Sequence, residues 1–268
     1  MTTAIFVENL CKTFSVRKSL PGLSGTLRSL IRPQFAEFQA ANALTFCVQR
    51  GEKIAFIGPN GAGKSTTIKM LTGILYPTSG RAEVLGLVPW KQRKKLAYLI
   101  GTVFGQRSQL WFQLPALDTF KLLAKIYELP RPLFKERLDS LVAMFEIEAL
   151  LDRPVRQLSL GERMRCELVA SLIHNPQILF LDEPTIGLDI NAKLQIRTYL
   201  NRLAKEHATT LFLTSHDTAD IEQVASRMLV LDKGSLLLDC SIANLKEMNK
   251  NASMEELIRD IYESAREV

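Results

Sequence analysis

Four short apolar segments along the chain have the length and the branched side chains of strands that are buried on both faces. They cover residues 53–57, 99–104, 178–181 and 210–213. Between them, apolar residues recur at helical spacing, and helices are the usual connections between parallel strands. The pattern therefore predicts an α/β protein built around a mainly parallel sheet.

Polar residues follow directly after each of the four segments. They are a glycine-rich turn at 58–66, Gln106, the pair Asp182 and Glu183, and the pair Ser215 and His216. In a parallel α/β sheet, ligands bind outside the carboxyl ends of the strands. We therefore expect these four groups to lie together at one end of the sheet.

Other segments of the chain predict smaller parts of the molecule. Residues 106–165 have a helical pattern, which predicts a helical subdomain inserted between strands of the sheet. Short apolar segments near 5–7, 44–48 and 82–85 predict an antiparallel β edge subdomain. Residues 15–41 hold prolines and glycines around a basic apolar stretch, which predicts an insertion longer than an ordinary loop.

One main domain is expected over 1–235, followed by a C-terminal tail over 236–268. In this tail, Met254, Leu257, Ile258 and Ile261 lie at positions that share one face of a short helix. We expect this helix to dock on the body of the protein.

Composition and charge narrow the function further. The 268 residues suffice for one sizeable core, because single cores stop growing at about 250 to 300 residues. No stretch reaches the about 18 unbroken apolar residues of a membrane span, and the N-terminus lacks the basic start of a secretory signal.

The four cysteines form no C-x-x-C pair, which argues against a zinc site. A net charge of +6 is weak support for a nucleic-acid partner, and none is expected.

The turn at 58–66 has the G-x-x-x-x-G-K-S spacing of a phosphate-binding loop, with a strand before it and a helix after it. Its glycines allow a tight turn that points backbone N–H groups at phosphate oxygens. A lysine and a serine then serve the terminal phosphates and Mg²⁺. The residues expected to bind nucleotide here are Gly58, Asn60, Gly61, Gly63, Lys64, Ser65 and Thr66.

Two further sites have a plain interpretation and a functional one. Asp182 ends an apolar strand, where a carboxylate needs a cation or a hydrogen bond, and Mg²⁺ is the natural partner. Ser159, followed three residues later by Glu162, is a capping box that begins a helix. The N-terminus of a helix with an exposed serine and Gly161 is also an anion site.

The order of these motifs, with Leu158-Ser-Leu-Gly-Glu162 between the phosphate loop and Asp182-Glu183, resembles the ATP-binding subunit of an ABC transporter. The resemblance covers about residues 5–234. It implies a P-loop NTPase fold that consists of a mainly parallel sheet, an antiparallel β edge subdomain and an inserted helical subdomain. The usual motif L-S-G-G-Q differs here, because Leu160 replaces a glycine and Glu162 replaces the glutamine.

The resemblance also implies roles for individual residues. Glu183 would polarise the attacking water, His216 would sense the γ-phosphate, and Gln106 would reach the metal and link the site to the helical subdomain. Ser159 and Gly161 would meet the γ-phosphate held by an opposite subunit, and Asp189 would touch its counterpart across the dimer. Phe14 would stack on adenine, with a core phenylalanine as the alternative.

These features predict an enzyme that binds ATP and Mg²⁺ and hydrolyses ATP as a homodimer or heterodimer. It would drive a separate integral membrane permease from the cytoplasmic side, as a peripheral protein on the inner face of the cell membrane. The sequences of the motifs resemble those of the ABC-2 type exporters most. Trp111 and Phe112 are candidates to line the groove for the permease, and ordinary packing is the alternative. A soluble ABC ATPase that is not coupled to transport is the alternative function.

Overall fold

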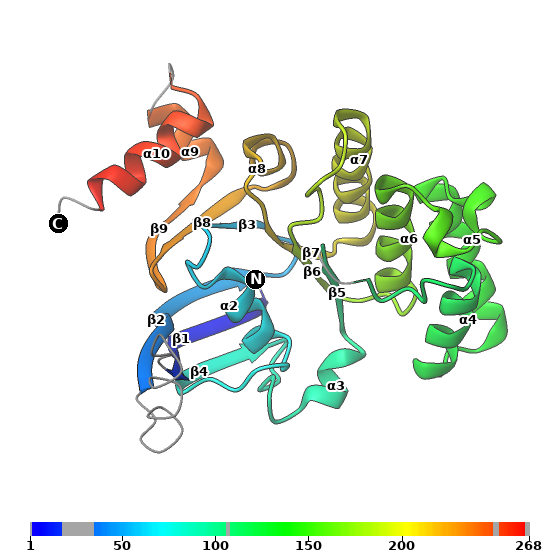
Figure 1. Ribbon diagram of the computed structural model, residues 1–268, viewed down its shortest axis with the longest axis horizontal. Helices are drawn as coiled ribbons and strands as arrows, with labels where there is room; N and C mark the ends of the chain where they lie inside the picture. The colour runs from blue at the N-terminus through cyan, green and yellow to red at the C-terminus, as the bar shows by residue number, and fades with distance from the viewer. Residues whose placement is uncertain (1, 18–34, 106–107, 249–251, 266–268) are drawn as a thin grey trace, which may run out of the picture.

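A computed structural model describes residues 2–17, 35–105, 108–248 and 252–265. Figure 1 shows a central sheet, a smaller antiparallel sheet packed below it, and a group of helices at the far side from the C-terminus. None of the helices in these described ranges combines the length and the apolar character that crossing a membrane requires.

The central sheet has six strands and contains all four predicted segments. Its strands run parallel from β5 to β8, and β9 pairs antiparallel with β8 at the edge. In spatial order they are β5 (Ile100–Phe104), β6 (Ile178–Asp182), β7 (Thr210–Thr214), β3 (Lys53–Ile57), β8 (Arg227–Asp232) and β9 (Ser235–Ser241). The prediction of a mainly parallel sheet is confirmed.

The central strands are buried on both faces, which explains their continuous apolar sequence. Phe180 and Phe212 pack on one face, with ring centroids 5.6 Å apart, against the antiparallel sheet and α2 (Lys64–Leu71). Leu179 and Leu181 pack on the other face against α6 (Leu160–Leu172) and α7 (Ile190–His207). The helix α8 (Thr218–Val224) follows β7 and lies beside α7 on the same side of the sheet in Figure 1.

The antiparallel sheet consists of β2 (Phe35–Gln49), β1 (Thr3–Arg17) and β4 (Ser79–Val84), in that order. The paired strands extend into the range expected as an insertion, since Ser15 pairs with Glu37 and Arg17 with Phe35. Residues 15–17 and 35–41 are therefore strand, held by ladder hydrogen bonds that the Pro- and Gly-rich composition did not indicate. The rest of the expected insertion, 18–34, lies outside the described residues.

The helical subdomain contains α4 (Ala116–Ile126), α5 (Arg131–Phe145) and the first part of α6, with two short 3₁₀ turns, η1 (Glu148–Leu150) and η2 (Val155–Gln157). Phe120, Leu138, Leu141 and Phe145 are buried, while Ile126 of α4 is 53% exposed. The helix α6 does not stop at residue 165. It runs on to Leu172 and packs on β5, so one helix joins the subdomain to the sheet. The small helix α3 (Arg93–Ala97) precedes β5.

The range expected as a C-terminal tail, 236–268, begins with a strand of the main sheet. Lys233 and Gly234 have φ values of 45° and 81°, and this two-residue turn sends the chain back as β9 in the main sheet. After β9 come two helices, α9 (Ile242–Met248) and α10 (Met254–Ser264). Met254 and Leu257 of α10 are buried on the helix face that the sequence indicated, and Met254 packs in a cluster with apolar residues of β3, β8 and α8.

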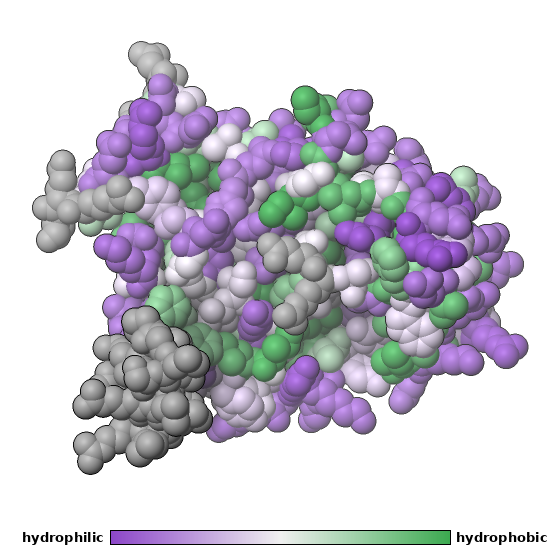
Figure 2. All heavy atoms as spheres, in the orientation of Figure 1, coloured by the Kyte–Doolittle hydropathy of each residue, from purple (hydrophilic) through white to green (hydrophobic). Residues whose placement is uncertain are grey.

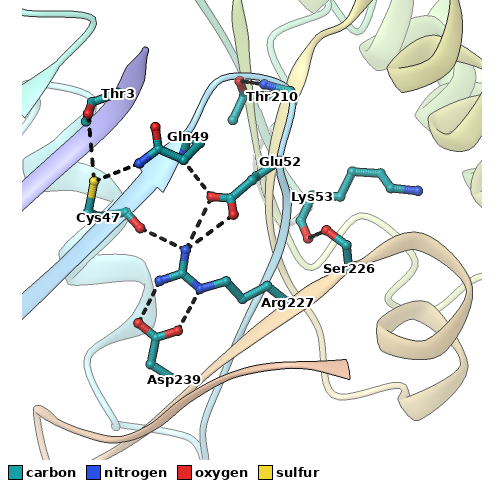
Figure 3. Close-up of polar contacts among 10 residues, drawn as sticks. Thr3, Cys47, Gln49, Glu52, Lys53, Thr210, Ser226, Arg227 and Asp239 are labelled. Atoms are coloured by element: carbon teal, nitrogen blue, oxygen red, sulfur yellow. Dashed lines mark hydrogen bonds and ion pairs between the residues drawn. The ribbon is translucent and has the colours of Figure 1, made fainter. Parts of the chain in front are cut away.

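Arg227 ties the two sheets together (Figure 3). Its Nε and Nη2 atoms donate to the two carboxylate oxygens of Asp239 on β9, at 2.6 and 2.7 Å. Its Nη1 atom donates to the Cys47 carbonyl on β2 at 2.9 Å and lies 3.3 Å from Glu52. One planar guanidinium thus holds β2, β8 and β9 in a fixed relation, which a lysine could not reproduce.

Candidate active site

The glycine-rich turn lies between β3 and α2, as its spacing predicted. Gly61 and Gly63 have φ values of 84° and 104°, in the region that glycine alone adopts readily. A Cβ atom at Gly63 would lie 2.0 Å from the carbonyl oxygen of Ala40 on β2. Glycine is therefore required at this position, because the antiparallel sheet passes directly over the turn.

Lys64 begins α2, and its ammonium group points back into the turn. The Nζ atom donates to the carbonyl oxygen of Gly58 at 2.5 Å and lies 3.2 Å from Nε2 of His216. Only 6% of Lys64 is exposed. Burial lowers the pKa of this ammonium, against the opposing attraction of the carboxylates of Glu183 and Asp182. These two acids keep a positive charge favourable at the place where phosphates would bind.

The other residues of the turn are arranged to receive an anion. Asn60 and Gly61 are exposed, and Ser65 and Thr66 lie half-buried in the first turn of α2. Backbone N–H groups at the N-terminus of a helix have no partner within the helix, and the helix dipole favours negative charge there. The turn thus fits the phosphates of a nucleotide.

Glu183 directly follows β6 in a left-handed conformation with φ of 56°. Such a conformation costs a non-glycine residue about 1 kcal/mol and is found at functional sites. Its N–H group donates to the carbonyl and the hydroxyl oxygen of Thr214, at 3.2 and 3.0 Å. The same hydroxyl group donates to Asp182 at 2.7 Å. Thr214 was not predicted as a site residue, because a β-branched residue at the end of a strand gives no signal beyond strand propensity.

His216 lies between Lys64 and Glu183. Its Nε2 atom is 2.9 Å from Oε1 of Glu183 and 3.2 Å from Nζ of Lys64. An Nε2 that carries hydrogen donates to the carboxylate, and an Nε2 without hydrogen accepts from the ammonium, so the two contacts suit different tautomers of the ring. The structure thus brings Lys64, Glu183 and His216 together, as expected from their places after three neighbouring strands.

A cavity of about 600 Å³ opens beside these residues. Its walls include Gly58, Pro59, Glu183 and His216, and the opposite wall comes from α10 through Glu255, Ile258 and Tyr262. This contribution of α10 was not predicted, because the sequence shows an apolar helix face without showing what it packs on. Among the described residues that line the cavity, none belongs to the segment 158–162.

Ser159 is the N-cap of α6, and the predicted capping box is present. Its hydroxyl oxygen accepts from the N–H of Glu162 at 3.2 Å, and the Glu162 carboxylate accepts from the N–H of Ser159 at 2.7 Å. The carboxylate also lies 3.2 Å from Arg153. The hydrogen bond from the Ser159 backbone, together with Arg153, lowers the pKa of Glu162. The charge that replaces the usual glutamine is therefore locally compensated.

Asp189 is the N-cap of α7 and accepts from the N–H of Ala192 at 2.9 Å. The first turn of α7 touches the start of α6, since a Cβ atom at Gly161 would lie 2.9 Å from Cβ of Ala192. The next residue, Ile190, is 78% exposed. Ser159, Gly161 and Asp189 thus form a second group of site residues, and none of the three lines the cavity, although Gly187 and Lys193 on either side of Asp189 do.

The two remaining predicted site residues are Phe14 and Gln106. Phe14 is half-buried on β1, pairs with Phe38 on β2, and has the ammonium group of Lys12 5.1 Å from its ring centroid. It is therefore not a core phenylalanine. Gln106 lies outside the described residues.

The donor set at the carboxyl ends of β3 and β6 suits Mg²⁺ when nucleotide is bound. Asp182 uses one oxygen for Thr214, and Ser65 lies at the start of α2. The described ranges hold no group of three His, Cys, Asp or Glu side chains that is placed to hold a metal ion. Mg²⁺ at phosphate sites needs no such cage, because it takes one or two protein ligands and fills its shell with phosphate and water.

Comparison with known proteins identifies the family to which the chain is similar. The family model described as "ABC transporter" matches residues 41–186. The bacitracin transport ATP-binding protein BcrA of Bacillus licheniformis is 32% identical over 79% of this chain and 68% of its own length. The daunorubicin resistance ATP-binding protein DrrA3 of Streptomyces coeruleorubidus is 31% identical over 85% of this chain and 71% of its own length.

A solved structure shares the fold over nearly the whole chain. It is cbiO1 of Clostridium perfringens, described as part of the ABC transporter complex cbiONQ. It superimposes with a TM-score of 0.76 at 28% identity and covers 97% of this chain and 95% of its own. With the motifs in order and the fold in common, the chain belongs to the ABC transporter family as an ATP-binding subunit.

Proposed function

We propose that this chain binds MgATP on the turn at 58–66 and hydrolyses it with Glu183, in a site completed by a second subunit. The observation that supports this most is the meeting of Lys64, Glu183 and His216 at one point. Phosphoryl transfer needs mainly positioning and charge neutralisation, and these three side chains supply both.

Each residue has a distinct part in this proposal. Lys64 and the backbone N–H groups of the turn hold the β- and γ-phosphates. Glu183 orients and polarises the attacking water, and His216 holds the Glu183 carboxylate or contacts the γ-phosphate. Ser65, Asp182 and Gln106 would hold Mg²⁺, which supplies positive charge to the phosphate oxygens when it is bound. Phe14 would contact the adenine ring.

The position of Ser159 supports a two-subunit site. Ser159 and Gly161 form an anion-binding helix start that does not face the cavity of the same chain. A second subunit placed head to tail would bring its own helix start to the phosphates. The exposed Ile190 beside Asp189 lies where this second subunit would make contact.

A membrane permease is the partner that the family and the surface favour. Trp111 and Phe112 are each 51% exposed, just before α4. On the face shown in Figure 2, apolar side chains are visible among hydrophilic ones over the region of the helical subdomain. The names of BcrA and DrrA3 refer to transport of, and resistance to, antibiotics. An ABC-2 type exporter, with this chain on the inner face of the cell membrane, fits both observations.

The test is Glu183→Gln, which keeps the shape and hydrogen bonds of the side chain and removes its charge. We expect ATP hydrolysis to fall by roughly 10²- to 10³-fold, because the water loses its polarising group. ATP binding should persist, and ATP should drive the variant into dimers that gel filtration detects. Glu206→Gln, at an exposed pair on α7, is the matched control. A variant that hydrolyses ATP at the normal rate would contradict the proposal.

A further inference from the structure

Asp220 is a buried carboxylate that is not among the proposed catalytic residues. It connects the chain segments that carry those residues. Asp220 on α8 is only 1% exposed. Its Oδ2 atom accepts from the hydroxyl groups of Thr185 and Ser215, at 2.5 and 2.6 Å, and its Oδ1 atom accepts from Nε of Arg197 at 2.6 Å. Both oxygens are therefore satisfied, as a buried charge requires.

The partners of Asp220 stand next to Glu183 and His216 in the chain. Thr185 lies two residues after Glu183, and Ser215 directly precedes His216. A single carboxylate oxygen thus fixes the loop after β6 relative to the loop after β7. The contact between Glu183 and His216 depends on the relative placement of these two loops.

Asp217, the residue after His216, is bonded to two basic residues of α7, one of which is again Arg197. Asp217 accepts from Nζ of Lys193 at 2.8 Å, and Nη2 of Arg197 lies 3.0 Å from its Oδ2 atom. Lys193 and Arg197 are one turn apart on α7, and Arg197 is itself buried. The residues before and after His216 are therefore both bonded, directly or through Asp220, to one rigid helix.

The helix α7 begins at the loop expected to face the second subunit. Asp189 caps it, and Gly187 packs against Leu160, where a Cβ atom would lie 3.1 Å from the leucine side chain. A shift of this loop moves α7, and the guanidinium of Arg197 passes the shift to both catalytic loops. Well-packed helices move as units, so the connection is mechanical.

We propose that Asp220 is a positioning residue that sets the distance between Glu183 and His216 and ties both of them, through Arg197, to the dimer-facing start of α7. The inference rests on the proposed function of Glu183 and His216. Asp220 itself touches no nucleotide in this scheme. Its effect is to keep the catalytic carboxylate and the switch imidazole in the geometry that hydrolysis needs.

The experiment compares three variants that remove one link each. Asp220→Asn keeps the size of the side chain and loses its charge, while Thr185→Val and Ser215→Ala each remove one hydroxyl donor. For each variant we expect kcat for MgATP to fall by roughly 10- to 100-fold, because small misplacements of catalytic groups have effects of that size. The KM for ATP should change by less than about threefold, because the phosphate turn is untouched.

The double variant Thr185→Val with Ser215→Ala separates positioning from general stability. If Asp220 acts through these two hydroxyls, adding Asp220→Asn to the double variant should lower kcat by less than about twofold further. A purely structural role would instead lower the melting temperature and leave the kcat of the folded fraction unchanged. Glu206→Gln on the exposed face of α7 is the control and should behave as the native protein.

The outcomes separate this inference from the proposed function. Native protein without ATPase activity, or Glu183→Gln with full activity, would overturn the function of the site and the inference with it. If Glu183→Gln is inactive and Asp220→Asn has native kcat, the inference alone is overturned. If Asp220→Asn does not fold, Thr185→Val decides, since it is nearly isosteric and leaves the pair of Asp220 and Arg197 intact. Native kcat in that variant overturns the inference.

Discussion

At the scale of single residues, His174 is the buried histidine that the motifs left without a function. Its ring stacks on Tyr127 at the end of α4, with centroids 4.0 Å apart and planes within 10°. Its Nε2 atom donates to the carbonyl oxygen of Ile100 at the start of β5, at 2.9 Å. With 8% of the residue exposed, burial lowers its pKa from 6.5 to about 4. His174 therefore joins the helical subdomain to the sheet as a neutral ring.

The lowered pKa of His174 predicts that the stability of the protein depends on pH through this residue. The unfolded chain binds a proton at His174 below pH 6.5 and the folded chain does so only near pH 4, so stability is lost as the pH falls through this window. Between pH 7.5 and pH 5 the loss is about 2 kcal/mol. His174→Phe should retain the stack and make the urea-derived free energy of unfolding less dependent on pH by that amount. His207→Phe, at an exposed position, is the control, and an equal change in both variants would refute the prediction.

At the scale of elements, the tie made by Arg227 shows how the two sheets are held in register. Arg227→Lys keeps the charge but cannot make the forked contact with Asp239 while also reaching the Cys47 carbonyl. We expect urea denaturation to show a loss of about 1 kcal/mol, since paired charge-assisted hydrogen bonds are lost from a partly exposed site. Arg202→Lys, at the exposed pair with Glu206, should cost less than about 0.5 kcal/mol. Equal losses of unfolding free energy in the two variants would show that the contacts of Arg227 stabilise the fold no more than an exposed ion pair does.

Elements whose own residues determine them could be predicted from the sequence, and those fixed by distant contacts could not. The strands β3, β6 and β7 are buried on both faces, so their apolar runs identified them. The turn at 58–66 needs glycine for its own backbone, and this requirement is visible in the sequence. By contrast, β9 was taken as tail, because its place in the sheet depends on pairing with β8. The contribution of α10 to the cavity wall could not be predicted for the same reason. Nor could the hydrogen bond from the Thr214 hydroxyl to Asp182, which forms only because β6 and β7 are neighbours.

At the scale of the whole molecule, the two halves of the proposed site lie on different parts of the chain. Glu183 and His216 line the cavity and Lys64 contacts His216, while Ser159 and Asp189 cap the starts of α6 and α7. The head-to-tail dimer that we propose would bring each half against the complementary half of the other subunit. Such a dimer has two equal sites that are related by its twofold axis.

This arrangement predicts that two inactive variants restore each other's activity. Lys64→Ala removes the phosphate-binding ammonium, and Ser159→Phe blocks the helix start of α6, so each variant alone should lack ATPase activity. In a mixed dimer, the native lysine of one subunit meets the native serine of the other, which leaves one intact site. Random pairing makes half of the dimers mixed, so an equimolar mixture should show about a quarter of the native activity. A mixture that stays inactive, while both variants fold and dimerise with ATP, would place the whole site within one chain.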